Sequence, residues 1–351
     1  MTRLGKLAHL LDRTLNPLRS IEIFGMFGPG NLGDEAMLVA AHKHLPRYRC
    51  SSYRTYFERP VLKAVLRQRP LSDLLVGGGT LIHGGNAGWL DYVEMMSQRR
   101  SKVSFLGTGM AFLPEQIEDP SPAFERWARI FERSDEIHLR GPHSAALAQR
   151  MCGRGEVFGD FAFLLHTPEM INSNHASREN VVGINVGECL GDQAEFERQI
   201  VRLIRHVTAR AFIVFHAVVE SDVPVINRVI AQSGAPSSAY RVETHYFDPI
   251  AFMARVRNYR AFLGLKMHAA GLALICGVPS LVIAYLPKVR DFLEPLGNAD
   301  DLILELPLSL DHTIARVETL LSRPERFIRL GEIEATAVRQ RATIRRIFYT
   351  N

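Results

Sequence analysis

Short apolar runs that end in glycine or a polar turn alternate with helical patterns along this chain, and that alternation restricts the possible folds most. In the first half the runs are IEIFGMF at 21, DLLVGGG at 73, KVSFLGTG at 102, EIHLRG at 136 and EVFGD at 156. Because a helical pattern follows most of them, the series predicts successive βα units that build a parallel sheet. We therefore expect an α/β domain over residues 21–167.

A second series of strand-like runs follows a polar stretch that contains Pro168 and has no periodicity. Its runs are VVGINVG at 181, AFIVFHAVVE at 211, a weaker one near RVETHYF at 241, RAFLGLKMH at 260, SLVIAY at 280 and DLILEL at 301. We expect a linker at 168–180 and a second α/β domain over 181–351 that ends in helices. Two such domains usually bind their ligand at the carboxyl ends of their strands.

The composition is that of an ordinary globular protein. The 351 residues are 47% hydrophobic and 23% charged, which excludes a disordered or fibrous chain. The formal charge of +5 suits anionic small molecules, acidic lipid surfaces or nucleic acid, but no nucleic-acid-binding motif occurs, so a nucleic-acid partner is not expected. The four cysteines form no C-x-x-C pair, which argues against a zinc knuckle or disulfide framework and favours a cytoplasmic location.

The N-terminal residues 1–20 form an amphipathic helical pattern. Its apolar positions are Leu4, Leu7, Leu11, Leu15 and Leu18, with basic side chains between them. The helix over residues 3–19 either packs against its own domain or a second subunit, or rests on an anionic membrane surface as a peripheral anchor. No apolar run approaches the ~20 residues that cross a bilayer, and the oligomeric state stays open.

The stretch FGPGNLGDEAML contains Gly28-x-Gly30-x-x-Gly33, the pattern of a dinucleotide-binding loop. Asp34 and Glu35 follow at once, where they would stabilise the helix dipole and repel a phosphate. No acidic residue follows at the distance needed to bind a ribose, and the Gly-Lys-Ser/Thr of a P-loop is absent. The loop therefore predicts a tight turn into a helix with both carboxylates in its first turn, and no nicotinamide or flavin cofactor.

Together with motifs further along, this loop resembles the polysaccharide pyruvyl transferase family. The matching stretches are FGPGNLGDEAML, LVGGGTLIHGG, FLGTGM, LRGPHSAALA, FGDFAFLL and, most continuously, residues 264–297. The resemblance covers about residues 21–300 and rests on the order and spacing of the pieces. It implies an α/β fold of the GT-B type, in which the parallel sheets of two Rossmann-type domains face a central cleft. It also implies transfer of the pyruvyl unit of phosphoenolpyruvate to two hydroxyls of a sugar, which gives a cyclic ketal and phosphate.

Phosphoenolpyruvate carries a carboxylate and a phosphate, so its site needs cations and no neighbouring acids. We assign to donor binding the cations near strand ends within the resemblance, with two residues of the glycine loop: Arg140, Lys266, Lys288, Arg290, Gly30 and Asn31. Phosphoenolpyruvate would act as a co-substrate, without a metal ion or another cofactor. For Arg140 a surface position is the alternative.

His268 is the candidate proton carrier of the reaction. It lies two residues beyond Lys266, after the strand-like run FLGL, and opens the next helical pattern. Alternation along a strand would point Lys266 and His268 to one face, so that both reach one ligand. His268 would protonate the methylene carbon or activate a sugar hydroxyl, and both roles stay open. Arg140 is the second residue assigned to catalysis.

The acceptor implied by the resemblance is a sugar or a lipid-linked oligosaccharide. Its candidate contacts are His83, Asn86, Trp89, His216 and Asp34. Trp89 offers a flat face to a sugar ring, with core packing as the equal alternative. For His216 a structural role is at least as favoured as a ligand contact.

Two departures from the family pattern leave alternatives open. Lys266-Met267-His268 stands where the family has Arg-Leu-His, and Arg140-Gly141 where it has Arg-Asp. A lysine keeps the charge of an arginine but loses its bidentate geometry, so the donor could differ. One alternative is a GT-B glycosyltransferase with a nucleotide-sugar donor, although LKMHAAGLALICGVPS contains no acid to bind a ribose. The other is a non-catalytic scaffold of an envelope-assembly complex.

Overall fold

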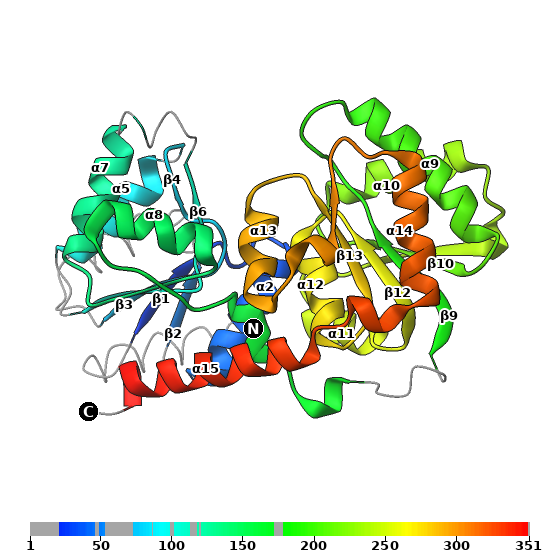
Figure 1. Cartoon of the computed structure of the whole chain (residues 1–351). Helices are drawn as coiled ribbons and strands as arrows, with labels where there is room; N and C mark the ends of the chain where they lie inside the picture. Colours follow the sequence, from blue (N-terminus) through cyan, green and yellow to red (C-terminus); the bar gives the residue numbers. More distant parts are fainter. Residues whose placement is uncertain are drawn as a thin grey trace, which may run out of the picture. The chain divides into compact units, whose positions relative to one another are not determined.

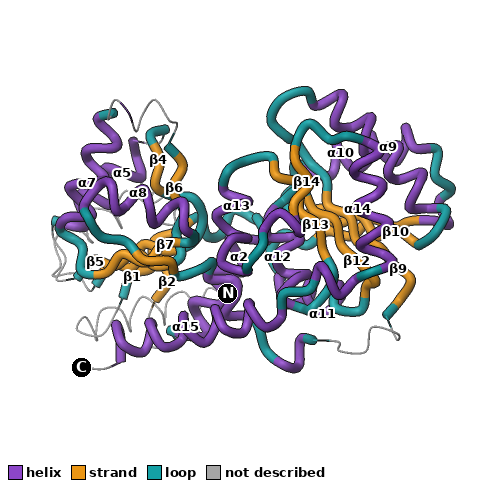
Figure 2. The backbone as a smooth tube through the Cα atoms, in the orientation of Figure 1, coloured by secondary structure: helices purple, strands orange, loops and turns teal. Residues whose placement is uncertain are grey.

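The computed structural model describes residues 21–349 except 46–48, 53–72, 86, 99–101, 113–117, 119–120 and 172–177. The chain divides into two compact units, each with its own parallel sheet (Figure 1, Figure 2). Unit 1 consists of Met1–Pro29 and Leu38–Phe161, and unit 2 of Gly30–Met37 and Ala162–Asn351. The amphipathic helix predicted for residues 1–20 lies outside the described residues.

Unit 1 contains a six-stranded parallel sheet in the order β2-β1-β3-β5-β7-β8. Its strands are β1 (Glu22–Gly25), β2 (Arg49–Ser52), β3 (Leu74–Gly77), β5 (Val103–Leu106), β7 (Glu136–Leu139) and β8 (Glu156–Val157). A separate parallel pair joins β4 (Ile82–His83) to β6 (Met110–Ala111). Its main helices are α5 (Ala87–Ser97), α7 (Pro122–Glu132) and α8 (Pro142–Cys152), and α2 (Leu32–His44) begins in unit 2 and continues into unit 1. Each run predicted as a strand in this half contains one.

The core of unit 1 lies between its sheet and helices α5, α7 and α8. Helix α7 shows how the sequence sets this up: the Ser121 hydroxyl accepts a hydrogen bond from the Phe124 N–H, and Pro122 occupies the first helical position. Trp127 and Phe131, one turn apart, are then buried against Phe105 of β5, whose ring meets both edge-on.

Unit 2 contains a six-stranded parallel sheet in the order β11-β10-β9-β12-β13-β14. Its strands are β9 (Glu179–Asn185), β10 (Phe212–Ala217), β11 (Tyr240–Thr244), β12 (Tyr259–Gly264), β13 (Ser280–Ala284) and β14 (Ile303–Glu305). Its helices are α9 (Gln193–Thr208), α10 (Asp222–Ser233), α11 (Pro249–Val256), α12 (Met267–Ile275), α13 (Lys288–Leu293), α14 (Leu310–Ser322) and α15 (Leu330–Tyr349). All six runs predicted as strands in this half are confirmed, as are the helices at the end of the chain.

The order of the strands in unit 2 indicates the edge of the sheet at which a ligand would bind. The chain moves outward from β9 to β11 and then returns to add β12 to β14 on the other side of β9. Helices α9, α10 and α14 cover one face of the sheet, and α11 and α12 cover the other (Figure 1). The strand order therefore reverses between β9 and β12, and such sheets bind ligands outside the carboxyl ends of the strands at that point.

The borders of the units differ in detail from the sequence-based expectation. Residues 30–37, expected within the first domain, group with unit 2. Inside the expected linker 168–180, a 3-10 helix forms at Pro168–Met170 and β9 already begins at Glu179. Contacts, rather than position in the chain, group residues into a compact unit, and only tertiary structure supplies those contacts.

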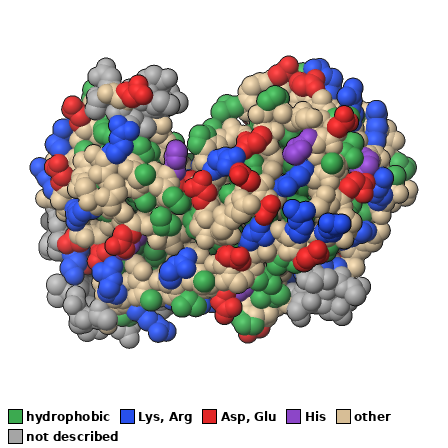
Figure 3. All heavy atoms as spheres, viewed as in Figure 1, with side chains coloured by type: hydrophobic (Ala, Val, Ile, Leu, Met, Phe, Trp, Pro, Cys, Tyr) green, Lys and Arg blue, Asp and Glu red, His purple; other side chains and the backbone are tan. Residues whose placement is uncertain are grey.

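Charged side chains of both signs are interspersed on the face of the molecule that Figure 3 shows. Among the described residues, ion pairs include Arg126 with Asp91 in unit 1 and Arg290 with Asp300 in unit 2. None of the helices in the described part of the chain combines the length and the apolar character needed to cross a membrane.

Candidate active site

Asn185, the last residue of β9, joins three strand ends of unit 2. Its Oδ1 accepts a hydrogen bond of 2.8 Å from the backbone N–H of Lys266, beyond β12. Its Nδ2 donates to the carbonyl of His216 in β10 at 2.9 Å and to Oδ2 of Asp222 at 3.0 Å. The side chain has no exposed surface. A buried amide can satisfy a donor and acceptors at once, so Asn185 fixes the backbone of Lys266 relative to Asp222.

Lys266 precedes the first residue of α12, and its side chain is 23% exposed. Its Nζ lies 3.8 Å from Oδ1 of Asp222 and 5.8 Å from the centroid of the Tyr285 ring. On the same ring, Nζ of Lys288 lies 5.3 Å from the centroid. Two of the predicted donor cations thus share one aromatic ring, which attracts both ammonium groups.

His268 opens α12, as the sequence predicts, but its relation to Lys266 differs from the prediction. Because β12 ends at Gly264, the two side chains do not alternate along a strand, and they have different neighbours. The imidazole of His268 meets the Phe292 ring edge-on, with centroids 5.7 Å apart. The imidazole also packs directly against Gly33: a Cβ added to this glycine would come within 2.0 Å of Nδ1 of His268.

The glycine loop forms the predicted tight turn into α2. Gly30 has φ +82°, and a Cβ there would come within 2.7 Å of the Phe247 ring. Asn31 accepts a hydrogen bond of 3.1 Å from the N–H of Gly33 through its side-chain oxygen, which caps the helix. Both residues serve the geometry of the turn, and their predicted role in donor binding stays a prediction.

Asp34 and Glu35 lie in the first turn of α2, as predicted. They are only 7% and 8% exposed, so Asp34 offers little surface to an acceptor. The start of the helix is attached to unit 2 by the N–H of Leu32, which donates to the carbonyl of Val218 at 3.0 Å.

Arg290 was predicted to bind the donor, but two carboxylates already bind it. One terminal nitrogen donates to Asp300 at 2.9 Å and the other to Glu305. Its charge is therefore compensated within α13 and the segment that follows, whereas a donor site needs cations that are available to the ligand.

Arg140 follows β7 in unit 1 and is 1% exposed, so the alternative of a surface arginine is wrong. Its Nη2 donates to Oγ1 of Thr80 at 3.2 Å, and its backbone N–H donates to the carbonyl of Thr108 at 3.0 Å. A Cβ on Gly109 would come within 2.1 Å of the same Nη2. The guanidinium is packed against the loops that follow β3 and β5.

Two predicted acceptor contacts lie together in unit 1. The rings of His83 and Trp89 meet edge-on with centroids 5.4 Å apart. Trp89 is 9% exposed and belongs to the core of the unit, which supports its core-packing alternative. His83 accepts a hydrogen bond from the N–H of Gly85, and burial lowers its pKa. Asn86 lies outside the described residues.

His216 is fully buried in unit 2, which speaks against its predicted contact with the acceptor. Its ring packs against the rings of His245, Phe252, Tyr259 and Phe262. Burial, followed by the charges of His245 and Arg241, lowers the pKa of His216 well below its usual value. The imidazole is therefore neutral at physiological pH.

One group of side chains in the described residues has the spacing of metal ligands. Donor atoms of His216, Glu243 and His245 lie within 4.8 Å of one another. The carboxylate of Glu243 is, however, bound by Arg241 at 2.7 Å and by Arg255 at 3.3 Å. Two guanidinium groups disfavour a metal cation beside them, so this cluster is not a good metal site.

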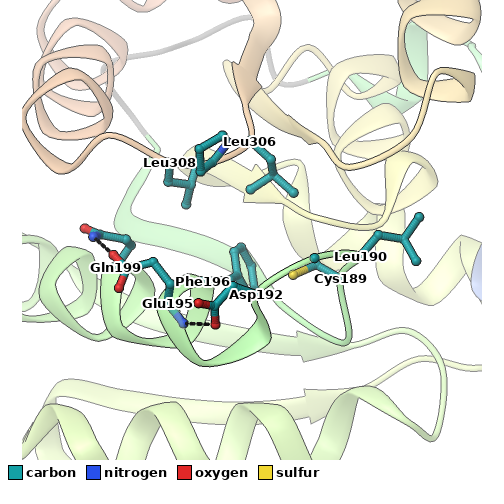
Figure 4. Close-up of a pocket in the computed structure, with 10 residues that line it drawn as sticks. Cys189, Leu190, Asp192, Glu195, Phe196, Gln199, Leu306 and Leu308 are labelled. Atoms are coloured by element: carbon teal, nitrogen blue, oxygen red, sulfur yellow. Dashed lines mark hydrogen bonds between the residues drawn. The ribbon is translucent and has the colours of Figure 1, made fainter.

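A pocket of about 310 Å³ lies at the same carboxyl edge of unit 2 (Figure 4). Leu306, Pro307 and Leu308, which follow β14, line one side, and the turn after β9 together with the first turns of α9 lines the other. The side chains on that second side include Cys189, Leu190, Asp192, Glu195, Phe196 and Gln199. Apolar walls with two carboxylates suit a neutral ligand better than an anion.

Sequence reasoning did not assign Asn185 or Tyr285 to the site. The available signal for Asn185 was a single amide at the end of the apolar run VVGIN, where a buried polar group needs partners. Tyr285 stands directly after the strand β13 and gave no signal of its own, because its contact with both lysines depends on the fold.

The family model described as polysaccharide pyruvyl transferase matches residues 31–287. Among solved structures, UDP-GlcNAc 2-epimerase from Neisseria meningitidis bound to UDP-GlcNAc is similar, with 13% identity, a TM-score of 0.58, and coverage of 95% of this chain and 100% of that chain. A glycosyltransferase from Rickettsia africae has 8% identity and a TM-score of 0.55, over 96% of this chain and 100% of the other. Both similarities place the fold in the GT-B class. Among curated proteins, none matches this sequence.

Proposed function

The chain belongs to the polysaccharide pyruvyl transferase family, and from this premise we propose that it moves the pyruvyl group of phosphoenolpyruvate onto two hydroxyls of a sugar. The sugar belongs to a cell-surface polysaccharide or its lipid-linked precursor, and the products are a cyclic ketal and phosphate. The contact between His268 and Gly33 carries the proposal, because it joins an early and a late part of the family segment at the ligand-binding edge of unit 2.

The donor binds through the cations at this edge. Lys266 and Lys288 present their ammonium groups around Tyr285, and the N-terminus of α12 begins between Lys266 and His268. Helix N-terminal N–H groups and a lysine together attract a phosphate, so the phosphate of the donor lies at this helix start. Its carboxylate turns toward Lys288. The paired charge of Arg290 makes no contact with the donor.

The chemistry needs one proton carrier, and His268 fills that role. It gives a proton to the methylene carbon, which makes C2 electrophilic, and the first sugar hydroxyl adds to C2. The proton of that hydroxyl returns to His268. The C2–O bond to phosphate then breaks, the second hydroxyl closes the ring, and its proton leaves with the phosphate. Lys266 and the helix N-terminus stabilise the charge that develops on the departing phosphate. Phosphoenolpyruvate is the co-substrate, and no further cofactor takes part.

The acceptor sugar occupies the pocket beside Phe196. A sugar ring has an apolar face that packs on apolar side chains, and Asp192 and Glu195 accept hydrogen bonds from its hydroxyls.

The protein acts in the cytoplasm, and residues 3–19 hold it on the inner face of the plasma membrane. Deletion of residues 1–19 should abolish co-sedimentation with anionic vesicles. Equal sedimentation of both forms would contradict this placement.

Calorimetry with phosphoenolpyruvate tests the donor. Wild type should bind it, Lys266→Ala should bind at least tenfold more weakly, and His268→Ala should bind while failing to release phosphate with any acceptor. A panel of nucleotide sugars provides the comparison. Binding of a nucleotide sugar without binding of phosphoenolpyruvate would replace this proposal with a GT-B glycosyltransferase.

A further inference from the structure

Asp222 is a buried carboxylate whose two oxygens have different surroundings. Oδ2 accepts hydrogen bonds from Nδ2 of Asn185 at 3.0 Å, from the N–H of Val218 at 3.0 Å and from that of Val219 at 3.4 Å. Oδ1 has no hydrogen-bond partner, although the side chain has no exposed surface. Three donors on one oxygen fix the orientation of the carboxylate, so Oδ1 can point in only one direction.

That direction is toward Lys266. The Nζ of Lys266 lies 3.8 Å from Oδ1, and the backbone of Gly187 packs against both side chains. A Cβ on Gly187 would come within 2.2 Å of Oδ1 and 3.3 Å of Cε of Lys266. Only a glycine allows the carboxylate and the lysine to approach each other here.

The separation of 3.8 Å is longer than a hydrogen bond. Asp222 therefore attracts the ammonium group electrostatically and leaves its N–H groups available to a ligand. Lys266 is 23% exposed while Asp222 is not exposed at all, so a ligand can reach the lysine but not the acid. Asn185 holds the backbone of Lys266 and the carboxylate of Asp222 through one amide. The geometry is therefore fixed at both ends.

We propose that Asp222 is a positioning residue for the donor site: its fixed carboxylate holds the ammonium group of Lys266 where it meets the phosphate of phosphoenolpyruvate. This inference rests on the proposed function for the identity of the ligand. An opposite charge 3.8 Å away attracts the ammonium group and restricts the flexible side chain of Lys266. Burial raises the pKa of Asp222, and the N–H of Val218 and the charge of Lys266 counter part of that rise.

Other titratable groups surround this pair. Cys189, in the turn after β9, interacts electrostatically with Lys266, and burial raises its pKa. Tyr246, beyond β11, feels the charge of Asp222, and its pKa is raised chiefly by burial. The Nζ of Lys288 lies 5.3 Å from the centroid of the Tyr285 ring. In the described residues, Asp222 is the carboxylate that pairs with Lys266, so removal of its charge should change the position of the lysine most.

The first test is Asp222→Asn, which keeps an acceptor for the N–H groups of Val218 and Val219 but removes the charge. NMR relaxation of the side-chain signal of Lys266, assigned with Lys266→Arg, should show a more mobile ammonium group in the variant. The KM for phosphoenolpyruvate should rise more than kcat falls. Asp248→Asn removes an exposed capping carboxylate at α11 and should change neither.

The second variant, Gly187→Ala, separates the two groups without changing either charge. The new methyl should also release the ammonium group of Lys266 and raise the KM for phosphoenolpyruvate. Unchanged NMR relaxation of Lys266 in a folded Asp222→Asn or Gly187→Ala protein would overturn the proposal and leave Asp222 as a cap of its own turn. The relaxation measurement needs no ligand: a more mobile Lys266 in variants of a protein that never binds phosphoenolpyruvate would support the pair and refute the proposed donor.

Discussion

His268 lies on the α-carbon of Gly33, a residue far from it in the sequence. An ideal Cβ on Gly33 would come within 2.0 Å of Nδ1 and 2.4 Å of Cγ of the imidazole, distances that real Cβ atoms do not reach. Unlike Gly28 and Gly30, Gly33 does not have a positive φ. Its lack of a side chain therefore serves the approach of the imidazole, not the backbone conformation.

Gly33→Ala should displace His268 and lower kcat by about 100-fold, because a shift of about 1 Å in a reacting group has that effect. Binding of phosphoenolpyruvate should change much less. Phosphate-release kinetics and calorimetry measure the two effects. Gly331→Ala is the matched control, since a Cβ there meets nothing within 4 Å and alanine favours the helix α15. Full activity of Gly33→Ala would show that His268 does not take part in the reaction.

Lys288→Ala and Arg290→Ala should behave differently although the residues are two apart. Lys288 beside Tyr285 is assigned to the carboxylate of the donor, so its loss should weaken phosphoenolpyruvate binding about tenfold, or about 1.4 kcal/mol. Arg290 is bound to Asp300 and Glu305 on the surface, so its loss should leave binding unchanged and reduce stability by less than about 1 kcal/mol. Calorimetry on both variants checks this, and the reverse order of effects would restore Arg290 to the donor site.

Arg140→Ala should destabilise unit 1 by about 2–4 kcal/mol. The change leaves a cavity beside Gly109 and removes the hydrogen bond to Thr80. Urea unfolding measures the loss. If stability is unchanged while phosphoenolpyruvate binding disappears, Arg140 contacts the donor as the sequence analysis predicts, and its packing is incidental.

His216 should make the protein sensitive to acid. Its folded pKa lies below the unfolded value of about 6.5, so the unfolded chain binds more protons in this range and stability falls as pH decreases below 6.5. The loss should not exceed about 1.4 kcal/mol per pH unit below 6.5, which is the slope for one proton. His216→Phe fits the same ring cluster without a titrating group. The difference in unfolding free energy between variant and wild type should therefore grow in favour of the variant from pH 7 to pH 5, and a constant difference would contradict the assignment.

Leu308→Trp should fill much of the pocket beside Phe196 and raise the KM for the acceptor by at least tenfold, while phosphoenolpyruvate binds as before. Phosphate-release kinetics at saturating donor give the acceptor KM. Val338→Trp places the same side chain on an exposed position of α15 and serves as the control. A higher KM for phosphoenolpyruvate instead would assign the pocket to the donor.

In the described residues, the apolar runs predicted five strands of the sheet in unit 1 and all six of the sheet in unit 2, because buried strands of a parallel sheet are apolar. They missed β2, whose sequence RCSS contains no apolar run. The acids after Gly33 predicted the start of α2 and argued against a dinucleotide, since local charge and helix dipole act over a few residues. The order of the glycine and Lys-x-His motifs predicted the family to which the chain belongs. Burial was not predictable: Arg140 and His216 are buried, and no local pattern distinguishes a buried polar residue from an exposed one.

Local patterns predicted most of the strands and helices, the fold class and the polar residues at the carboxyl ends of the strands, because these depend on a few neighbouring positions. Which of those residues act together depends on the tertiary structure. It placed Gly33 under His268, joined Asp222 to Lys266 through Asn185, and neutralised Arg290 with two carboxylates. Such contacts arise where strands distant in the chain end at one edge of a sheet, and they are fixed by the strand order and not by any local sequence.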